Sequence, residues 1–167
     1  KLRWADFLAD YYINSDSLYR HGPPDFEVIE RLRDRGQLTA FNLGIFDAVS
    51  RDATAASNTL AGLRTAYDQA KALGVLDRAY IYGFDECKPE MFPLLEKTAQ
   101  TLRQEFPGVL LMTTSYDHSY GMETVAKTLD AWCPLTPSFK PDQAAKARAA
   151  GRHVWWYICC GPHPPHA

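Results

Sequence analysis

Two adjacent carboxylates, Asp85 and Glu86, directly follow residues 79–84, an apolar run rich in aromatic side chains. A run of this composition favours strand structure and must bury most of its surface. In parallel α/β proteins the carboxyl ends of the strands open onto the ligand cleft. Acids at such a position can divide the roles of general acid and electrostatic stabiliser. Asp85 and Glu86 are therefore the main candidates for catalytic residues.

A purely structural interpretation of the same pair is helix capping. Acidic side chains stabilise the N-terminal end of a helix, and a helical pattern begins near residue 90. Capping alone, however, would not require the aromatic strand that precedes the acids. Gly83 also permits a local kink or the close approach of a ligand to the backbone. We therefore favour the catalytic interpretation.

Polar or aromatic side chains also occur at the ends of the other predicted strands. The candidate substrate-binding residues are Asn42, Tyr82, Tyr116, Asp117, Trp132, Trp155 and Tyr157. Some have a structural alternative, since Tyr116 and Asp117 could form hydrogen bonds within a loop and Trp132 could pack against a helix. Strand alternation places Trp155 and Tyr157 on one face. At least one large ring of this strand should therefore face the interior of the barrel or its mouth.

Helical and extended patterns alternate along the chain. We expect helices at 2–9, 25–36, 57–74, 90–106 and 141–150, with a further short helix before residue 129. The expected strands are a weak one at 12–19 and stronger ones at 38–43, 75–84, 109–113, 129–133 and 153–159. This alternation predicts right-handed βαβ units and a parallel sheet. No GxGxxG or Walker loop follows any strand, so we predict an α/β fold of the partial (β/α)8 TIM-barrel type with about six parallel strands.

Chain length and composition predict one folded domain over residues 1–167. The 167 residues are 46% hydrophobic and 13% aromatic, which is typical of a globular protein. A complete (β/α)8 barrel needs about 250 residues. We therefore expect a fragment of a catalytic barrel that lacks the first and last strands. Its unpaired sheet edges could pair with a second copy, which would make the protein a homo-oligomer.

Charge and hydropathy argue against two classes of partner. The formal net charge is −2 and Lys and Arg form no cluster, so neither nucleic acid nor an anionic membrane surface is expected as a partner. No apolar stretch approaches the roughly 18 residues that a membrane-spanning helix needs. The sequence does not begin with Met, and a signal peptide could precede it.

The cysteines predict neither a disulfide framework nor a metal site. They are Cys87, Cys133, Cys159 and Cys160. None of their spacings is CxxC, and the adjacent pair cannot easily form a bridge because neighbouring side chains of a strand point to opposite faces. A zinc site that combines cysteines with His163 or His166 matches no known ligand spacing. We therefore expect small buried thiols and no metal or other cofactor.

Three segments of the chain together resemble a known enzyme family. They are Tyr-Gly-Phe-Asp-Glu at 82–86, Asp-Ala-Trp-Cys-Pro at 130–134 and Val-Trp-Trp-Tyr-Ile-Cys-Cys-Gly-Pro at 154–162. In this order they resemble the catalytic domain of glycoside hydrolase family 123, the β-N-acetylgalactosaminidase family. The resemblance implies a (β/α)8 barrel that cleaves terminal β-linked N-acetylhexosamine from a glycan, with N-acetylgalactosamine favoured. It also implies a secreted or periplasmic location.

The resemblance further implies separate roles for the two acids. In substrate-assisted retaining catalysis, the 2-acetamido oxygen of the sugar attacks the anomeric carbon. Asp85 would orient the acetamido group and stabilise its charge, while Glu86 would protonate the leaving oxygen and then activate water. Glu86 would need a raised pKa, which aromatic surroundings could provide. Because the barrel is truncated, the fragment could be inactive alone, and the alternative is a non-catalytic carbohydrate-binding or structural barrel fragment.

Overall fold

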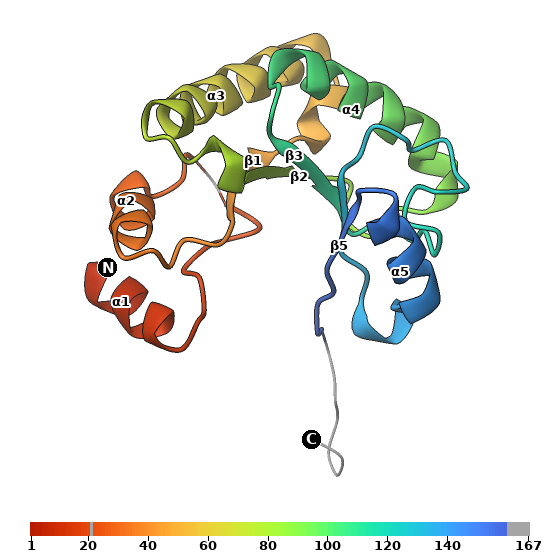
Figure 1. Ribbon diagram of the computed structural model, residues 1–167. Coiled ribbons are helices and arrows are strands. Elements are labelled where there is room, and N and C mark those ends of the chain that lie inside the picture. The colour runs from red at the N-terminus through yellow and green to blue at the C-terminus, as the bar shows by residue number, and fades with distance from the viewer. Residues whose placement is uncertain (21, 160–167) are drawn as a thin grey trace. The chain divides into compact units, whose positions relative to one another are not determined.

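The computed structural model describes residues 1–20 and 22–159, which form an α/β fold (Figure 1). Five strands form a parallel sheet in the order β1-β2-β3-β4-β5. They are β1 (Phe41–Ile45), β2 (Ala79–Tyr82), β3 (Leu110–Thr113), β4 (Ala131–Trp132) and β5 (His153–Val154). The predicted α/β fold of the TIM-barrel type is confirmed, with five strands where about six were expected.

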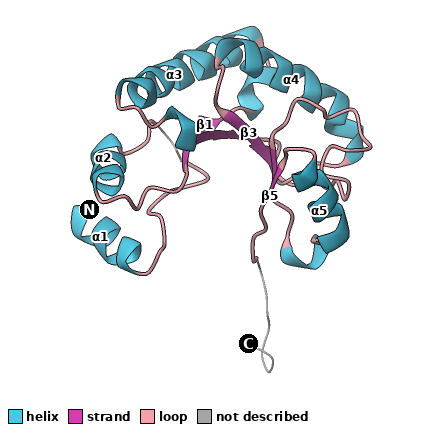
Figure 2. Ribbon diagram, viewed as in Figure 1, coloured by secondary structure: helices cyan, strands magenta, loops and turns pink. Residues whose placement is uncertain are grey.

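The helices agree with the sequence pattern at most positions. They are α1 (Leu2–Asp10), α2 (Phe26–Asp34), α3 (Ala53–Ala72), α4 (Phe92–Glu105) and α5 (Pro141–Ala149). Helix α3 begins at Ala53, earlier than predicted, because the Asp52 carboxylate caps it by accepting a hydrogen bond from the Ala55 N–H at 2.8 Å. The short helix expected before residue 129 is absent, since residues 114–130 form turns and bends (Figure 2).

The chain divides into two compact units. The first contains residues 1–83 and 101–110, and the second contains residues 84–100 and the chain from 111 onward. In the first unit β1 and β2 pair in parallel, with Phe41 opposite Ala79. In the second unit β4 pairs with both β3 and β5. The prediction of one domain that lacks the first and last barrel strands stays a prediction.

Residues 12–19 do not form the weak strand that the sequence predicted. Side chains of this loop instead bind the backbone of β1 and the residue before it. The Asn14 amide donates to the Ala40 carbonyl at 2.8 Å, and the Asp16 carboxylate accepts from the Asn42 N–H at 2.8 Å. Such contacts protect the edge of a sheet from pairing with another chain. The association of two copies through sheet edges stays a prediction.

Helix α2 has the ends that the sequence predicted. The Asp25 carboxylate accepts a hydrogen bond from the Val28 N–H at 3.4 Å, which makes Asp25 the N-cap. At the other end Gly36 has a φ of 68°, a left-handed conformation that glycine adopts without steric cost. The helix buries Val28, Ile29 and Leu32.

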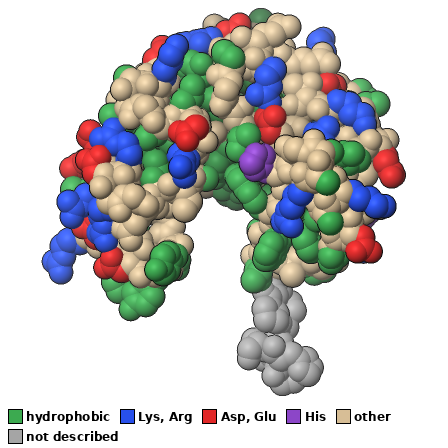
Figure 3. Space-filling model, viewed as in Figure 1, with side chains coloured by type: hydrophobic (Ala, Val, Ile, Leu, Met, Phe, Trp, Pro, Cys, Tyr) green, Lys and Arg blue, Asp and Glu red, His purple; other side chains and the backbone are tan. Residues whose placement is uncertain are grey.

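Helix α1 packs on α2 through small residues and leaves an aromatic face exposed. Ala5 and Ala9 are its buried residues, whereas Trp4, Phe7 and Tyr11 are 66%, 50% and 65% exposed. Their rings contact one another, with centroid distances of 5.5 and 5.2 Å, and Figure 3 shows hydrophobic side chains gathered over this helix. Within the described ranges, no helix is both long and apolar enough to cross a membrane.

Replacement of Gly62 by Ala is expected to stabilise the protein. Gly62 lies in the interior of α3, and a Cβ atom built on it meets nothing within 4 Å. Glycine in a helix interior is less stable than alanine by about 0.5–1 kcal/mol, so Gly62→Ala should raise the free energy of unfolding by about that amount. Urea denaturation followed by circular dichroism measures the change. The matched control is Ala61→Gly, which should lower stability by a similar amount, and a destabilised Gly62→Ala variant would contradict the open space at this position.

Candidate active site

The backbone of residues 84–86 adopts an unusual conformation. Phe84 and Glu86 have φ values of 55° and 47°, in the left-handed region that residues other than glycine rarely adopt. Each such residue costs about 1–3 kcal/mol and persists only where surrounding contacts enforce it, as often happens at active sites. Asp85 lies between them, and both acidic residues are exposed. The helical turn that follows, Pro89–Met91, has Lys88 and not an acid at its N-cap position.

Three hydroxyl side chains at the end of β3 hold this turn in place. Thr113 and Ser115 both donate to the carbonyl oxygen of Phe84, at 3.1 and 2.9 Å. Thr114 Oγ1 accepts a hydrogen bond from the Glu86 N–H at 2.9 Å and donates to Asp85 Oδ1 at 2.8 Å. Thr114 therefore connects the backbone of one acid to the side chain of the other, and the three hydroxyls supply the contacts that the strained turn requires.

The Glu86 carboxylate receives a hydrogen bond on each oxygen from a tyrosine. Tyr116 Oη donates to Glu86 Oε2 at 2.7 Å, and Tyr157 Oη donates to Glu86 Oε1. Tyr116 follows the end of β3, while Tyr157 lies beyond β5 and is positioned by a parallel bridge to Leu135. The second unit thus brings together three of the predicted site residues from segments far apart in the sequence.

The electrostatics of this cluster keep both phenols protonated. The hydrogen bond to Glu86, followed by burial, raises the pKa of Tyr116 above its ordinary value. Burial, followed by the hydrogen bond to Glu86, raises the pKa of Tyr157 strongly. Both tyrosines therefore act as donors at neutral pH. The two phenol donors hold the exposed Glu86 carboxylate in one orientation.

Asp117 lies in the loop after β3, where its carboxylate organises the backbone. It is buried, and it accepts four hydrogen bonds from the chain that follows it. The donors are the Ser119 N–H at 2.7 Å, the Ser119 hydroxyl at 2.6 Å, the Gly121 N–H at 2.7 Å and the Thr124 hydroxyl at 2.9 Å. These contacts occupy both carboxylate oxygens, which agrees with the loop alternative noted for this residue. Its role as a substrate ligand stays a prediction.

The two tryptophans of the predicted site occupy different environments. Trp132 is 1% exposed and its ring lies edge-on to Phe92, with 6.3 Å between centroids. The indole nitrogen of Trp132 is buried and has no hydrogen-bond partner among the described residues. Trp155 is half-buried, and its backbone N–H donates to the backbone carbonyl of Trp132 at 2.9 Å. Trp132 therefore packs in the core, and neither tryptophan has a recorded contact with Glu86.

Asn42 and Tyr82 belong to the first unit and are also buried. The Asn42 side chain donates to the Leu18 carbonyl at 2.8 Å and accepts from the Gly44 N–H at 3.0 Å. Tyr82 is 1% exposed, and its ring lies edge-on to that of Tyr19 at 6.0 Å. These contacts support the local structure of β1 and β2, and substrate binding by either residue stays a prediction.

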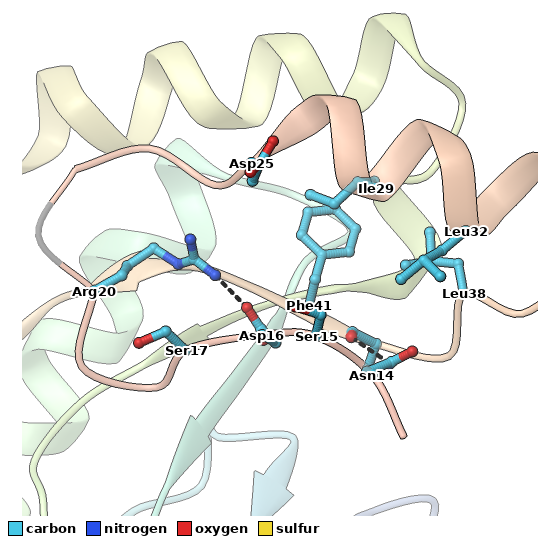
Figure 4. A pocket seen from close by; sticks show the side chains of 11 residues that line it. Asn14, Ser15, Asp16, Ser17, Arg20, Asp25, Ile29, Leu32, Leu38 and Phe41 are labelled. Atoms are coloured by element: carbon cyan, nitrogen blue, oxygen red, sulfur yellow. Dashed lines mark hydrogen bonds and ion pairs between the residues drawn. The ribbon is translucent and has the colours of Figure 1, made fainter. Parts of the chain in front are cut away.

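A polar cluster in the first unit was not predicted from the sequence. Asp16 Oδ2 accepts from the Tyr80 hydroxyl at 3.1 Å in addition to the Asn42 N–H, and Asp16 Oδ1 binds the Arg20 guanidinium (Figure 4). Asp16 and Arg20 of this cluster line a cavity of about 200 Å³. No sequence signal marked Asp16 or Arg20, because both lie in or beside the segment that was expected to be a strand.

The cysteine and acidic side chains of the described residues do not form a metal-binding group. Burial raises the pKa of the partly buried Cys133 to about 11, so this thiol stays protonated at neutral pH. Cys159 is exposed, so the expectation of buried thiols is wrong for this residue. Cys87 is partly buried and its sulfur lies 2.9 Å from Ser115 Oγ. In the part of the chain that the structure describes, no group of three or more His, Cys, Asp or Glu side chains could hold a metal ion. Cys160, His163 and His166 lie outside the described residues.

Comparison with known proteins relates the chain to others through its fold. No family model matches it, and no curated protein matches it. Among solved structures it is similar to a protein from Silicibacter pomeroyi DSS-3 named "Putative glycerophosphoryl diester phosphodiesterase". The TM-score is 0.50 at 18% sequence identity, and the match covers 80% of this chain and 45% of that chain. This chain therefore spans less than half the length of its structural neighbour.

The predicted membership of glycoside hydrolase family 123 is wrong. No family model matches the chain, and the structural neighbour carries the name of a phosphodiesterase. The functions inferred from that membership are therefore wrong as well. They are the cleavage of N-acetylhexosamine, the choice of N-acetylgalactosamine and the substrate-assisted mechanism. The three segments that carried the resemblance are short, and one fold hosts many unrelated functions, so short segments at strand ends do not fix the family. The comparisons show that the chain shares the α/β fold of this structural neighbour.

Proposed function

We propose that Glu86 is the general base of a hydrolytic active site whose substrate is a phosphodiester. The observation that carries the proposal is the pair of phenol donors, Tyr116 and Tyr157, that hold the two oxygens of one exposed carboxylate. The strained turn at residues 84–86 supports it, because a conformation of this kind is retained where function requires it.

In the proposed reaction Glu86 accepts a proton from a water molecule. The water oxygen attacks phosphorus, the bond from phosphorus to the leaving oxygen breaks, and the leaving oxygen takes the proton from Glu86. The products are a phosphomonoester and an alcohol. One phenol must move its hydrogen bond from Glu86 to a phosphoryl oxygen so that the carboxylate can receive the proton. Tyr116 is the better placed to do so, because it is 39% exposed.

The phosphodiester is the substrate class that the name of the structural neighbour suggests. Two adjacent acids oppose the binding of an anionic substrate, because like charges repel at close range. A hydroxyl donor offsets this repulsion at a phosphoryl oxygen, and Tyr116 supplies it when its hydrogen bond moves from Glu86 to the substrate. Asp85 accepts the Thr114 hydrogen bond, and in this proposal Asp85 and Thr114 together hold the turn that presents Glu86.

A panel of chromogenic esters tests the proposal. The protein is incubated with bis(4-nitrophenyl) phosphate, with 4-nitrophenyl phosphate and with 4-nitrophenyl acetate, each with EDTA and with added Mg²⁺. We expect nitrophenolate release from the diester at a rate proportional to protein concentration, and no release above background from the monoester. Glycerophosphocholine, followed by choline release, is the natural diester probe. If the acetate is cleaved and neither diester is, the site is hydrolytic but the phosphodiester assignment is wrong.

A further inference from the structure

The first unit contains a cavity of about 570 Å³ at the carboxyl end of β1. This volume lies within the range of pockets that bind small molecules. The cavity is bounded by the end of β1, by the N-terminal half of α3 and by the chain between them. Its apolar lining includes Leu43, Ile45, Ala48 and Leu63.

Two glycines leave room in this cavity. Gly62 of α3 has no atom within 4 Å of a Cβ built on it, so its missing side chain leaves open space. At Gly44 of β1 a Cβ would lie 2.9 Å from the Leu63 side chain. A side chain at Gly44 would displace that of Leu63, so Gly44 allows helix and strand to pack closely, whereas no packing contact explains Gly62. Glycine in a helix interior destabilises the helix. Its presence at position 62 is explained if a ligand occupies the cavity that it borders.

Guanidinium groups at the cavity favour a ligand that carries an anionic group. Arg20 and Arg51 line it, and Asp47 is the one acid among the lining residues that the structure describes. Arg51 forms no ion pair recorded in the described part of the chain. Arg20 is bound through one nitrogen to Asp16, while its Nε is buried with no hydrogen-bond partner in the described chain (Figure 4). Because Asp16 pairs with one nitrogen of Arg20, the donors available to an anionic group are the Arg51 guanidinium and the Arg20 Nε.

We propose that this cavity binds an amphipathic monoanion, a molecule with an apolar body and one carboxylate or phosphate group. The apolar body would replace water against Leu43, Ile45 and Leu63, and the anionic group would bind Arg51 at the cavity and approach Arg20. Guanidinium groups suit both headgroups because their planar N–H donors match carboxylate and phosphate oxygens. The proposal stands apart from the reaction assigned to Glu86.

Calorimetric titration with octanoate, octyl phosphate and 1-octanol tests the proposal. The three probes share the alkyl chain and differ in the headgroup. We expect saturable binding of octanoate, of octyl phosphate or of both, with octanol at least about tenfold weaker, because a hydrogen bond to a charged group contributes about 1.5–3 kcal/mol. The ratio of the two anion affinities identifies the headgroup. Equal affinity for octanol, or no binding of any probe, would overturn the proposal.

Two variants with matched controls locate the binding site. Gly62→Leu fills the cavity and should abolish binding, while Ala61→Leu adds the same side chain one residue away, outside the lining, and should bind as the unmodified protein does. Arg51→Gln should weaken anion binding about tenfold, while Lys71→Gln removes an equal charge elsewhere on α3 and should leave binding within about twofold. Thermal melts confirm that each variant is folded. Unchanged binding in folded Gly62→Leu would place the ligand elsewhere and refute the cavity as its site.

Discussion

Replacement of Glu86 by Gln is expected to lower kcat for phosphodiester hydrolysis by about 10²–10⁴-fold, which is the usual contribution of a positioned general base. Glutamine keeps the size of the side chain and can still accept one phenol hydrogen bond, but its amide cannot take a proton from water. KM should not rise, because Tyr116 and Tyr157 remain and one charge that repels the anionic substrate is removed. Steady-state kinetics with bis(4-nitrophenyl) phosphate measures both constants.

The matched control is Glu90→Gln. Glu90 is an exposed acid in the Pro89–Met91 turn, four residues after Glu86, and carries the same charge. Its replacement should leave kcat within about twofold of that of the unmodified protein, as a surface substitution away from the site does. A Glu86→Gln variant that retains more than a third of the activity would show that this carboxylate is not the base.

Replacement of Asp117 by Ala is expected to lower the free energy of unfolding by about 3 kcal/mol. The substitution leaves the backbone N–H groups of Ser119 and Gly121 and two hydroxyls without their acceptor. A buried donor without a partner costs about 1–3 kcal/mol. Local rearrangement of the loop gives some of the four donors new partners, so the total loss is smaller than the sum of four such costs. Urea denaturation followed by circular dichroism and by tryptophan fluorescence measures the loss.

Two further variants separate the structural role of Asp117 from ligand binding. Asp117→Asn keeps one acceptor oxygen and should lose about half as much stability as Asp117→Ala. Glu123→Ala removes an exposed acid from the same loop and should change stability by less than about 0.5 kcal/mol. A fully stable Asp117→Ala variant with reduced turnover would instead identify Asp117 as the substrate ligand that its position at the end of a strand suggested.

Much of the fold could be predicted because its signals are local. Asp25 caps α2 and Gly36 ends it within a few residues of the helix they define, and those interactions depend only on the neighbouring chain. The expected strand at 12–19 failed for a non-local reason. Its polar side chains bind β1 instead of adding a strand beside it.

The candidate catalytic residues also divide into those that local sequence signals mark and those that depend on non-local contacts. The position of Asp85 and Glu86 after an aromatic strand is visible in the sequence, and so is the row of hydroxyls at 113–115. Nothing in the sequence separates Tyr116, which binds Glu86, from Asp117, which binds its own loop. Adjacent residues point in different directions, and only the path of the chain decides which of them reaches the acid.

Three properties of this protein can be read from its amino-acid sequence: the alternation of helices and strands, the α/β class and the pair of acids at one strand exit. These properties follow from periodicity, capping and turn chemistry, which act over a few residues. The tertiary structure alone decided that Tyr116 and Tyr157, 30 and 71 residues from Glu86, both donate to its carboxylate. It likewise decided that Gly62 borders a cavity with Arg20 and Arg51. Contacts over such separations depend on strand register and on the packing of whole elements, which local sequence patterns do not encode.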